Sequence, residues 1–205
     1  MARYGLLVDL SRCIGCYSCV VGCKNWHRID AGEKGRIRLL DLVLGTYPDV
    51  SRWVMPLMCM QCDRPPCVSV CPTRAGYRRD DGIVTIDPEK CVGCELCTFA
   101  CPYGARTMRG DSPVADGCDL CANRVDEGLE PYCVESCPMD ALVFGDLDDP
   151  GSPIRKAIDF EKAEPLFKKF KTRPKVYYAN IGSLLETEGL PPLFAPRHGL
   201  TGEGI

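Results

Sequence analysis

Short apolar runs separated by polar turns are the main pattern along the chain. Strand-forming residues fill Ile83–Ile86 directly after an Asp-Gly turn signal, and two short strands are predicted between residues 36 and 44, ending at a turn over 46–49. Apolar and charged residues recur at helical spacing over 154–170, and Pro174–Tyr178 has the composition of a strand. We therefore expect a fold of the α+β class built from short elements.

The longest apolar runs are too short to cross a membrane. Leu39–Leu44 and Val54–Met60 fall far below the ~20 residues that a spanning helix needs. The first residues carry no basic segment followed by a long apolar one, and a cysteine motif begins at Cys13, so we expect no signal peptide. The last fifteen residues, from Pro191, are rich in proline and glycine, and no independent fold is expected there. Either disorder or a path along a partner subunit fits this tail.

The composition allows a hydrophobic core and gives no sign of a nucleic-acid partner. The chain has 205 residues, 45% of them hydrophobic, which is enough for one domain or two small ones. Its net charge is −3 at pH 7, so no basic surface for nucleic acid is expected. A chain of this size does not need disulfides to fold, unlike the short secreted chains that depend on them.

Sixteen cysteines fall into four motifs of four, with none left over. Numbered along the chain, motif one has Cys13, Cys16, Cys19 and Cys23; motif two has Cys59, Cys62, Cys67 and Cys71; motif three has Cys91, Cys94, Cys97 and Cys101; motif four has Cys118, Cys121, Cys133 and Cys137. Motif three has the spacing C-x2-C-x2-C-x3-C-P, which in bacterial ferredoxins holds one [4Fe-4S] cluster and sends its fourth cysteine to a neighbouring cluster. The spacing therefore predicts iron-sulfur clusters.

Zinc and haem are the alternatives for such motifs. Motifs two and four begin as CxxC pairs, as in zinc sites, but both end in C-x3-C-P, at Pro72 and Pro138. Motif one has Lys24 in place of the proline, so its fourth cysteine is expected to leave the loop at a different angle. No CxxC precedes a histidine, which excludes c-type haem, and His27 and His198 are expected to be surface or capping residues.

The motifs pair into two ferredoxin-like modules with two clusters each. The connector between motifs two and three is compact and carries the predicted strand at 83–86, as in a two-cluster ferredoxin, so these motifs belong together and motifs one and four pair by elimination. A tandem arrangement is disfavoured because 35 residues separate Cys23 from Cys59. If each fourth cysteine serves the other cluster of its pair, the predicted ligand sets are Cys13, Cys16, Cys19 with Cys137; Cys118, Cys121, Cys133 with Cys23; Cys59, Cys62, Cys67 with Cys101; and Cys91, Cys94, Cys97 with Cys71.

This pairing predicts that one module is nested within the other. The expected parts are residues 1–24 with 113–146 for motifs one and four, 25–58 for a small β-rich insertion, 59–112 for motifs two and three, and 147–205 for a C-terminal extension that contacts a partner. Short helices are expected before the fourth cysteines, at Val20–Gly22 and Thr98–Ala100.

Glycines and basic residues beside the ligands are candidates for tuning the reduction potentials of the clusters. The backbone N–H groups of Gly15 and Gly93 are expected to approach the cluster sulfides, or these glycines only permit the turn. Lys24, Lys90 and Arg64 lie beside ligands and could raise a local reduction potential, although most such charges are solvated. No catalytic residue is predicted.

With these motifs, the chain resembles the four-cluster iron-sulfur subunits of the dimethyl sulfoxide reductase superfamily, especially the polysulfide and thiosulfate reductase types. The resemblance covers roughly residues 3–180, from Tyr4–Leu10 through CxxCxxCxxxCK, CDRPPCVSVCPT, DGIVTIDPEKCVGCELCTFACPYGAR, CDLCANR and CVESCP to Thr172–Tyr178. Some relatives carry Trp in place of a cysteine of motif three and a three-iron cluster there. Cys97 is present here, so the resemblance implies four [4Fe-4S] clusters.

The resemblance implies an electron-transfer subunit that has no catalytic activity of its own. It implies a large catalytic subunit with a molybdenum or tungsten bis-pterin cofactor and, in many relatives, a quinone-reactive integral membrane subunit. The module of motifs one and four would lie near the catalytic subunit, and that of motifs two and three near the quinone end. The expected location is the cytoplasm, or export together with a signal-bearing catalytic partner.

Two other functions fit the sequence less well. A free polyferredoxin that diffuses between enzymes is disfavoured because a diffusing carrier needs neither the insertion nor the long tail. A structural role, in which the clusters only staple loops, is disfavoured by the presence of four clusters in a chain of this size.

Overall fold

The structure is a computed structural model that describes residues 2–182. Within this range the strands are β1 Tyr4–Asp9, β2 Arg38–Thr46, β3 Asp49–Leu57, β4 Gly76–Arg78, β5 Val84–Ile86, β6 Thr107–Met108, β7 Ala115–Asp116, β8 Leu142–Asp146, β9 Glu164–Pro165 and β10 Val176–Ala179. The helices are α1 Ser18–Trp26, α2 Pro66–Ser69, α3 Leu96–Ala100, α4 Ala122–Asp126, α5 Tyr132–Glu135, α6 Pro153–Glu161 and the 3₁₀ helix η1 Lys168–Phe170. The chain is therefore a mixed α+β protein built from short elements, as the sequence predicts.

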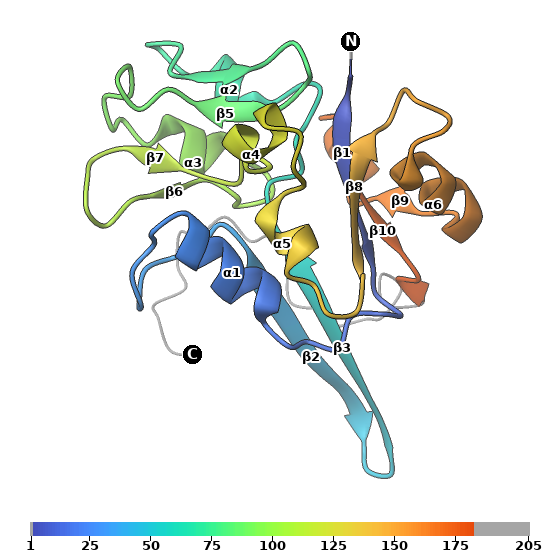
Figure 1. The fold of residues 1–205 in the computed structure, drawn as a ribbon. Helices are drawn as coiled ribbons and strands as arrows, with labels where there is room; N and C mark the ends of the chain where they lie inside the picture. Colours follow the sequence, from blue (N-terminus) through green and yellow to red (C-terminus); the bar gives the residue numbers. More distant parts are fainter. Residues whose placement is uncertain (1, 183–205) are drawn as a thin grey trace.

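The largest sheet joins the two ends of the described chain. Its strand order is β8-β1-β10-β9, with β1 antiparallel to β8 and parallel to β10. Leu6 pairs with Phe144 on one side and with Val176 on the other. In Figure 1 the blue strand β1 runs between β8 and β10. The first and last described strands are therefore neighbours in space.

The two faces of this sheet pack against different layers, because successive side chains of a strand point to opposite faces. Leu6 and Val8 join the main core, which also contains cysteines of motifs one, two and four. Leu7 packs on the other face with Ile154 and Ile158 of α6. Helix α6 therefore covers one face of the sheet, and the cysteine-rich core covers the other.

The insertion forms one long hairpin instead of short strands. β2 and β3 pair antiparallel along their whole lengths, and the predicted turn over 46–49 is confirmed. Tyr47 at the tip is exposed, whereas Met55 near the base is buried, and Figure 1 shows the hairpin projecting from the body. The polar pair Ser51-Arg52 interrupts the apolar pattern, which is why the sequence indicates β2 but not β3.

The prediction of a helix over 154–170 is correct only for its first half. Helix α6 ends at Glu161, because Lys162 has a left-handed backbone with φ of 50°. Pro165, which has no N–H, then lies in β9, and η1 follows. The helical spacing of the side chains continues past Glu161, but the backbone does not follow it.

The other predicted elements are confirmed. The strand at 83–86 is β5, which pairs with β4 across a turn where Gly82 has φ of 82°. The helical segments at 20–22 and 98–100 lie within α1 and α3, and the strand at 174–178 is β10, shifted by one or two residues. The tail from Pro191 lies outside the described residues.

The helices of the four motifs pack in two pairs. Helix α1 of motif one packs on α5 of motif four, and α2 of motif two packs on α3 of motif three. Gly22 permits the first contact, since a Cβ there would lie 3.0 Å from Ser136 Oγ and from the ring of Tyr132. We call motifs one and four with α1 and α5 the one/four half, and motifs two and three with α2 and α3 the two/three half. No helix among residues 2–182 is both long enough and apolar enough to cross a membrane.

Candidate metal centre

Motifs one and four share a hollow at the surface. It is lined by Cys13, Cys16 and Cys19 of motif one, by Cys137 of motif four, and by apolar side chains such as Ile14. Cys16 is exposed, whereas Cys19 is buried. The structure therefore brings together the four cysteines of the first predicted ligand set.

A second hollow lies between motifs two and three. It is lined by Cys91, Cys94 and Cys97 together with Cys71, and Cys67 also reaches it. Cys94 is exposed, as Cys16 is in the first hollow. These are the cysteines of another predicted set, again with one cysteine from the partner motif.

The remaining cysteines form two sets that lie deeper. Cys59 and Cys62 are buried and interact electrostatically with Cys67 and Cys101. In the other half, the buried thiols that interact are Cys23, Cys118, Cys121 and Cys133. Each deep set therefore also combines three cysteines of one motif with one of its partner motif.

Burial holds many of these thiols in the protonated form. Desolvation raises the pKa of Cys19, Cys23, Cys59 and Cys62 to about 12, because a thiolate is disfavoured in an apolar environment. Only the thiolate is a metal ligand, and a coordinated cation stabilises it. These cysteines therefore lose their protons when a metal centre binds and not otherwise.

The spacing of the thiols fits a group larger than a single metal ion. Zinc holds its sulfur ligands at about 2.3 Å, which places them only about 3.8 Å apart in a tetrahedron. Among residues 2–182, the one group of three or more Cys, His, Asp or Glu residues with ligand atoms all within 4.8 Å is His27, Asp119 and Cys121. No predicted cysteine set is as compact as a zinc site. Four cysteines around a hollow match the thiolates that hold an iron-sulfur cluster, so the residues present fit this group.

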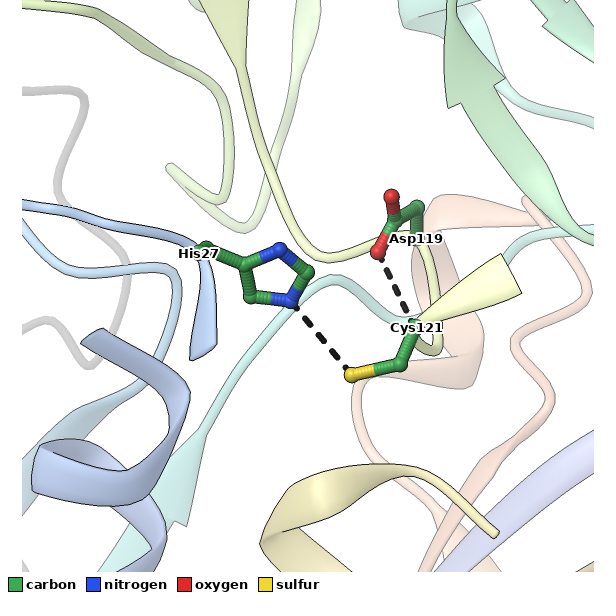
Figure 2. Close-up of side chains that lie close together, drawn as sticks. All are labelled: His27, Asp119 and Cys121. Carbon is green, nitrogen blue, oxygen red and sulfur yellow. Dashed lines mark hydrogen bonds between the residues drawn. The ribbon is translucent and has the colours of Figure 1, made fainter. Parts of the chain in front are cut away.

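His27 lies beside a cysteine of motif four (Figure 2). It is the C-cap residue of α1, in line with the expected capping role, and its Nε2 is 3.4 Å from Cys121 Sγ and 3.3 Å from Arg36 Nη1. Burial and the nearby Arg36 lower the pKa of His27. Asp119 Oδ1 accepts hydrogen bonds from the Cys121 N–H at 3.0 Å and from Arg36 at 2.8 Å. Because this oxygen already has two donors, the group positions Cys121 and does not form a separate ion site.

The Cys-Pro endings turn the chain so that a backbone N–H points back at the fourth sulfur. These bonds run from Gly76 to Cys71 at 3.4 Å, from Ala105 to Cys101 at 3.5 Å and from Ala141 to Cys137 at 3.3 Å. Motif one has no proline after Cys23, and helix α1 continues through Lys24 to Trp26. The expected different exit of motif one is confirmed, because Cys23 lies inside a helix while the other fourth cysteines follow one.

Motifs one and three share a glycine with the same unusual backbone. Gly15 and Gly93 both have φ of 69°, a region that favours glycine. A Cβ on Gly15 would lie 3.0 Å from the Val54 side chain, and one on Gly93 would collide with the Pro113 carbonyl oxygen. The turn and the crowding both require glycine here, and the Gly15 N–H also bonds the Cys13 sulfur.

The buried charges beside the cysteines are not those that the sequence indicates. Lys90 is exposed and pairs with Asp87, and Lys24 donates to backbone carbonyls. Instead, Arg106 is 3% exposed, and the side chain of Arg36 is 11% exposed. Sequence reasoning missed both arginines. The signal for Arg106 was an isolated cation among small and apolar residues directly after motif three.

Comparison with known proteins identifies the class. The family profile described as "4Fe-4S dicluster domain" matches residues 50–147, and one described as "4Fe-4S binding domain" matches residues 10–26. The putative iron-sulfur B subunit of dimethyl sulfoxide reductase from Halobacterium salinarum is 39% identical, over 88% of this chain and 80% of that protein. The B subunit of tetrathionate reductase from Salmonella typhimurium is 39% identical, over 90% of this chain and 75% of that protein. The B subunit of polysulfide reductase from Wolinella succinogenes is 38% identical, over 85% of this chain and 93% of that protein.

The protein belongs to the family of 4Fe-4S dicluster iron-sulfur subunits found in reductase complexes of the dimethyl sulfoxide reductase type. It is an electron-transfer subunit of an oxidoreductase complex. Its sixteen cysteines are consistent with four [4Fe-4S] clusters.

Proposed function

We propose that the chain holds its four clusters through four mixed ligand sets, each with three cysteines of one motif and the last cysteine of the paired motif. The two surface hollows and the two buried groups of thiols support this assignment. When bound, [4Fe-4S] clusters accept and donate single electrons. The proposed sets are Cys13, Cys16, Cys19 with Cys137; Cys118, Cys121, Cys133 with Cys23; Cys59, Cys62, Cys67 with Cys101; and Cys91, Cys94, Cys97 with Cys71.

The same assignment divides the chain into two nested ferredoxin-like modules. Residues 59–112 form the inner module, and 1–24 with 113–146 form the outer one. The packing of α1 on α5 and of α2 on α3 supports this division, because it joins the same pairs of motifs. The hairpin of 25–58 and the extension from 147 lie outside both modules.

The four sets follow one another in a line. Electrostatic interactions link neighbouring sets, Cys19 with Cys133, Cys118 with Cys59, and Cys67 with Cys97. The two end sets contain the exposed thiols Cys16 and Cys94, whereas most cysteines of the middle sets are buried. The chain therefore excludes water from the middle of the line and leaves access at its two ends.

Gln61 joins the two halves at the centre of this line. Its side chain is completely buried, donates from Nε2 to the Cys118 carbonyl at 2.7 Å and accepts the Val84 N–H at 2.7 Å. Both ends of the amide are satisfied, so this contact fixes the motif two loop against the start of motif four. A fixed contact keeps the two middle sets at a constant separation.

We infer two partners for the two exposed ends. The named relatives are subunits of dimethyl sulfoxide, tetrathionate and polysulfide reductases, which supports a large catalytic partner with a molybdenum or tungsten bis-pterin cofactor. The end that contains Cys16 faces this partner. The end that contains Cys94 faces a quinone-reactive membrane subunit or another redox protein. A free polyferredoxin is the alternative.

The first test is anaerobic purification of the chain from its native cell, followed by metal analysis and mass spectrometry of the proteins that co-purify. Four clusters predict about sixteen irons per chain, together with a large subunit that contains molybdenum or tungsten. The same iron content without a large subunit would favour the free carrier, and zinc in place of iron would overturn the assignment.

Variants test the ligand sets. Cys94→Ser should remove or convert one cluster, and Cys71→Ser should affect the same electron paramagnetic resonance signal, because both cysteines belong to one proposed set. Ser69→Ala, close to Cys71 but outside every set, is the matched control. If Cys94→Ser and Cys71→Ser altered different signals, the exchange of fourth cysteines between motifs would be wrong.

A further inference from the structure

Arg106 is a buried cation that faces cysteines and little else. It directly precedes β6 and lines the hollow that contains Cys91, Cys94 and Cys97. Its side chain is almost fully buried, and neither Nη1 nor Nη2 has a hydrogen-bond partner among residues 2–182. The side chain has a hydrogen bond with Cys67, but leaving the Nη groups of a buried charge without acceptors is unfavourable. Something that the hollow holds must therefore supply the missing acceptors.

The electrostatic neighbours of Arg106 come from two ligand sets. Cys59 and Cys67 belong to one set and Cys97 to the next, and all three act on the guanidinium. An arginine guanidinium keeps its proton at physiological pH even when it is buried. The arginine therefore stays charged, at the boundary between two proposed cluster sites.

The chain makes room for this guanidinium by means of a glycine. A Cβ on Gly117 would lie 3.1 Å from Arg106 Nη1 and 2.9 Å from the Ala105 carbonyl oxygen. The φ of Gly117 does not lie in the left-handed region, so it is space and not backbone conformation that excludes a side chain here. Gly117 directly precedes Cys118, the first cysteine of motif four. The lack of space for a side chain at Gly117 therefore lies where the two halves meet.

We propose that Arg106 donates N–H bonds to sulfur atoms of both iron-sulfur sites of the two/three half and acts as their shared counter-charge, which raises both reduction potentials. The inference rests on the proposed function, because it needs clusters in both sets. Arg106 tunes the reduction potentials of the two sites and is not itself a ligand. Adding one electron to either site adds one negative charge close to a fixed positive one, and Arg106 keeps its proton throughout. A guanidinium suits this role because its several N–H donors lie in one plane and can reach two acceptors.

The test is a redox titration of the purified holo complex, followed by electron paramagnetic resonance and combined with iron analysis. In Arg106→Met, the ratio of reduced to oxidised cluster at a fixed solution potential should fall at least tenfold for both sites of the two/three half, which is 59 mV for a one-electron couple. Arg106→Lys keeps the charge but not the planar donors, and its shift should be smaller and in the same direction.

Lys175→Met is the matched control. Lys175 is also fully buried, but its Nζ donates to the Gly82 carbonyl and lies 4.0 Å from Asp63. The charged groups that act most on it are Asp63, Arg3, Arg78 and Asp81. Removing this cation should leave all four potentials unchanged. If Lys175→Met shifted the same two potentials as Arg106→Met, the effect would be one of general packing and the proposal would be wrong.

Each outcome decides either the proposal or the function on which it rests. Unchanged potentials in an Arg106→Met protein with full iron content overturn the proposal. If Arg106→Met loses iron, Arg106→Gln decides, because it removes the charge but keeps a polar side chain: a fall of both potentials supports the shared counter-charge, and no shift, or a shift of one site, overturns it. Wild-type protein without about sixteen irons would instead refute the proposed function itself.

Discussion

Arg36 in the one/four half and Arg106 in the two/three half are largely buried beside cysteines, but their charges are balanced in different ways; Arg124, also buried in the one/four half, pairs with Glu135. In the one/four half, Arg36 pairs with Asp116 and Asp119, each at 2.8 Å. In the two/three half, no ion pair to Arg106 is found among residues 2–182, and its Nη atoms have no acceptor. The Arg36 group is therefore net negative and the Arg106 group is net positive.

This difference shows how one fold can set different potentials with the same ligands. All four proposed sets use cysteine alone, so ligand identity cannot separate them, and the surrounding charge can. A site beside net negative charge resists an added electron, and a site beside net positive charge attracts it. We therefore expect the set with Cys59 to have a higher reduction potential than the set with Cys118.

The largest expected effect is a loss of stability in variants of the two matched loop glycines, Gly15 in the one/four half and Gly93 in the two/three half. Gly93→Ala forces a Cβ into a backbone carbonyl oxygen, which cannot move aside, and it should destabilise the protein by roughly 3 kcal/mol or more. Gly15→Ala meets only the Val54 side chain at 3.0 Å and should cost about 1–2 kcal/mol, mainly from the left-handed backbone. Anaerobic thermal unfolding of the two variants measures the difference. Equal losses would mean that the two loops are equally constrained.

The next largest effect is expected from a double variant that makes the charge around Arg36 net positive, as it is around Arg106. Asp116→Asn with Asp119→Asn removes both carboxylates and keeps the amide oxygens as acceptors. A unit charge at ~6 Å with an effective dielectric constant of about 20 is worth roughly 3 kcal/mol, or about 100 mV for one electron. The potential of the set with Cys118 should therefore rise by at least about 100 mV, while those of the two/three half stay constant.

Asp111→Asn is the control for the double variant. Asp111 is an exposed carboxylate on the same segment, pairs with Arg109, and lines neither of the two hollows that contain cysteines. Redox titration of this variant should reproduce the wild-type potentials. A rise as large as that of the double variant would show that distant surface charge, and not the Arg36 group, sets the potential.

A smaller effect is expected from Gly117→Ala. The added methyl group presses on Arg106 and the Ala105 carbonyl and should cost about 1–3 kcal/mol by overpacking. Because the guanidinium is displaced and not removed, both potentials of the two/three half should fall by less than in Arg106→Met. The combination of a lower unfolding temperature with this partial shift is the expected result. Potentials that fall as far as in Arg106→Met, or that do not fall at all, would contradict the expectation that they depend on the exact position of the Arg106 charge.

The smallest effect tests a candidate that the sequence alone suggests. Lys90 directly precedes Cys91, but it is exposed and pairs with Asp87 at 2.7 Å. Solvent screens such a pair. Lys90→Gln should leave the potential of the set with Cys91 unchanged within the error of a redox titration. A clear fall would mean that exposed charges matter here as much as buried ones.

Local spacing in the sequence predicts which cysteines lie together better than it predicts their surroundings. Two-residue and three-residue intervals specify loops, and the structure brings the cysteines of each predicted set together because such loops turn the sulfurs inward. Arg106 could not be placed in this way. Its environment depends on the packing of α2 on α3 and on the approach of Gly117, which no local pattern records.

The misplaced boundaries have a similar cause. The helical spacing over 154–170 is real, but the left-handed backbone of Lys162 and the missing N–H of Pro165 end the helix. Strand β3 was missed because Ser51 and Arg52 lie on the projecting part of the hairpin, where no buried face imposes alternation. Sequence periodicity reports burial, and it fails where an element leaves the core.

The pairing of β1 with β10 has a consequence for biosynthesis. The cysteines of the two/three half lie within one continuous stretch of chain, so their loops can come together as soon as that stretch has left the ribosome. The N–H groups of Asp63 and Arg64 in the motif two loop find their acceptors, the carbonyls of Arg173 and Thr172, only later. The one/four half needs Cys13 beside Cys137, and its sheet closes only when Val176 reaches Leu6. Long closures are slow because the entropy of a long loop must be lost first. Maturation should therefore start in the middle of the chain, and the strand pairing delays completion of the one/four half until nearly all of the described chain has been made.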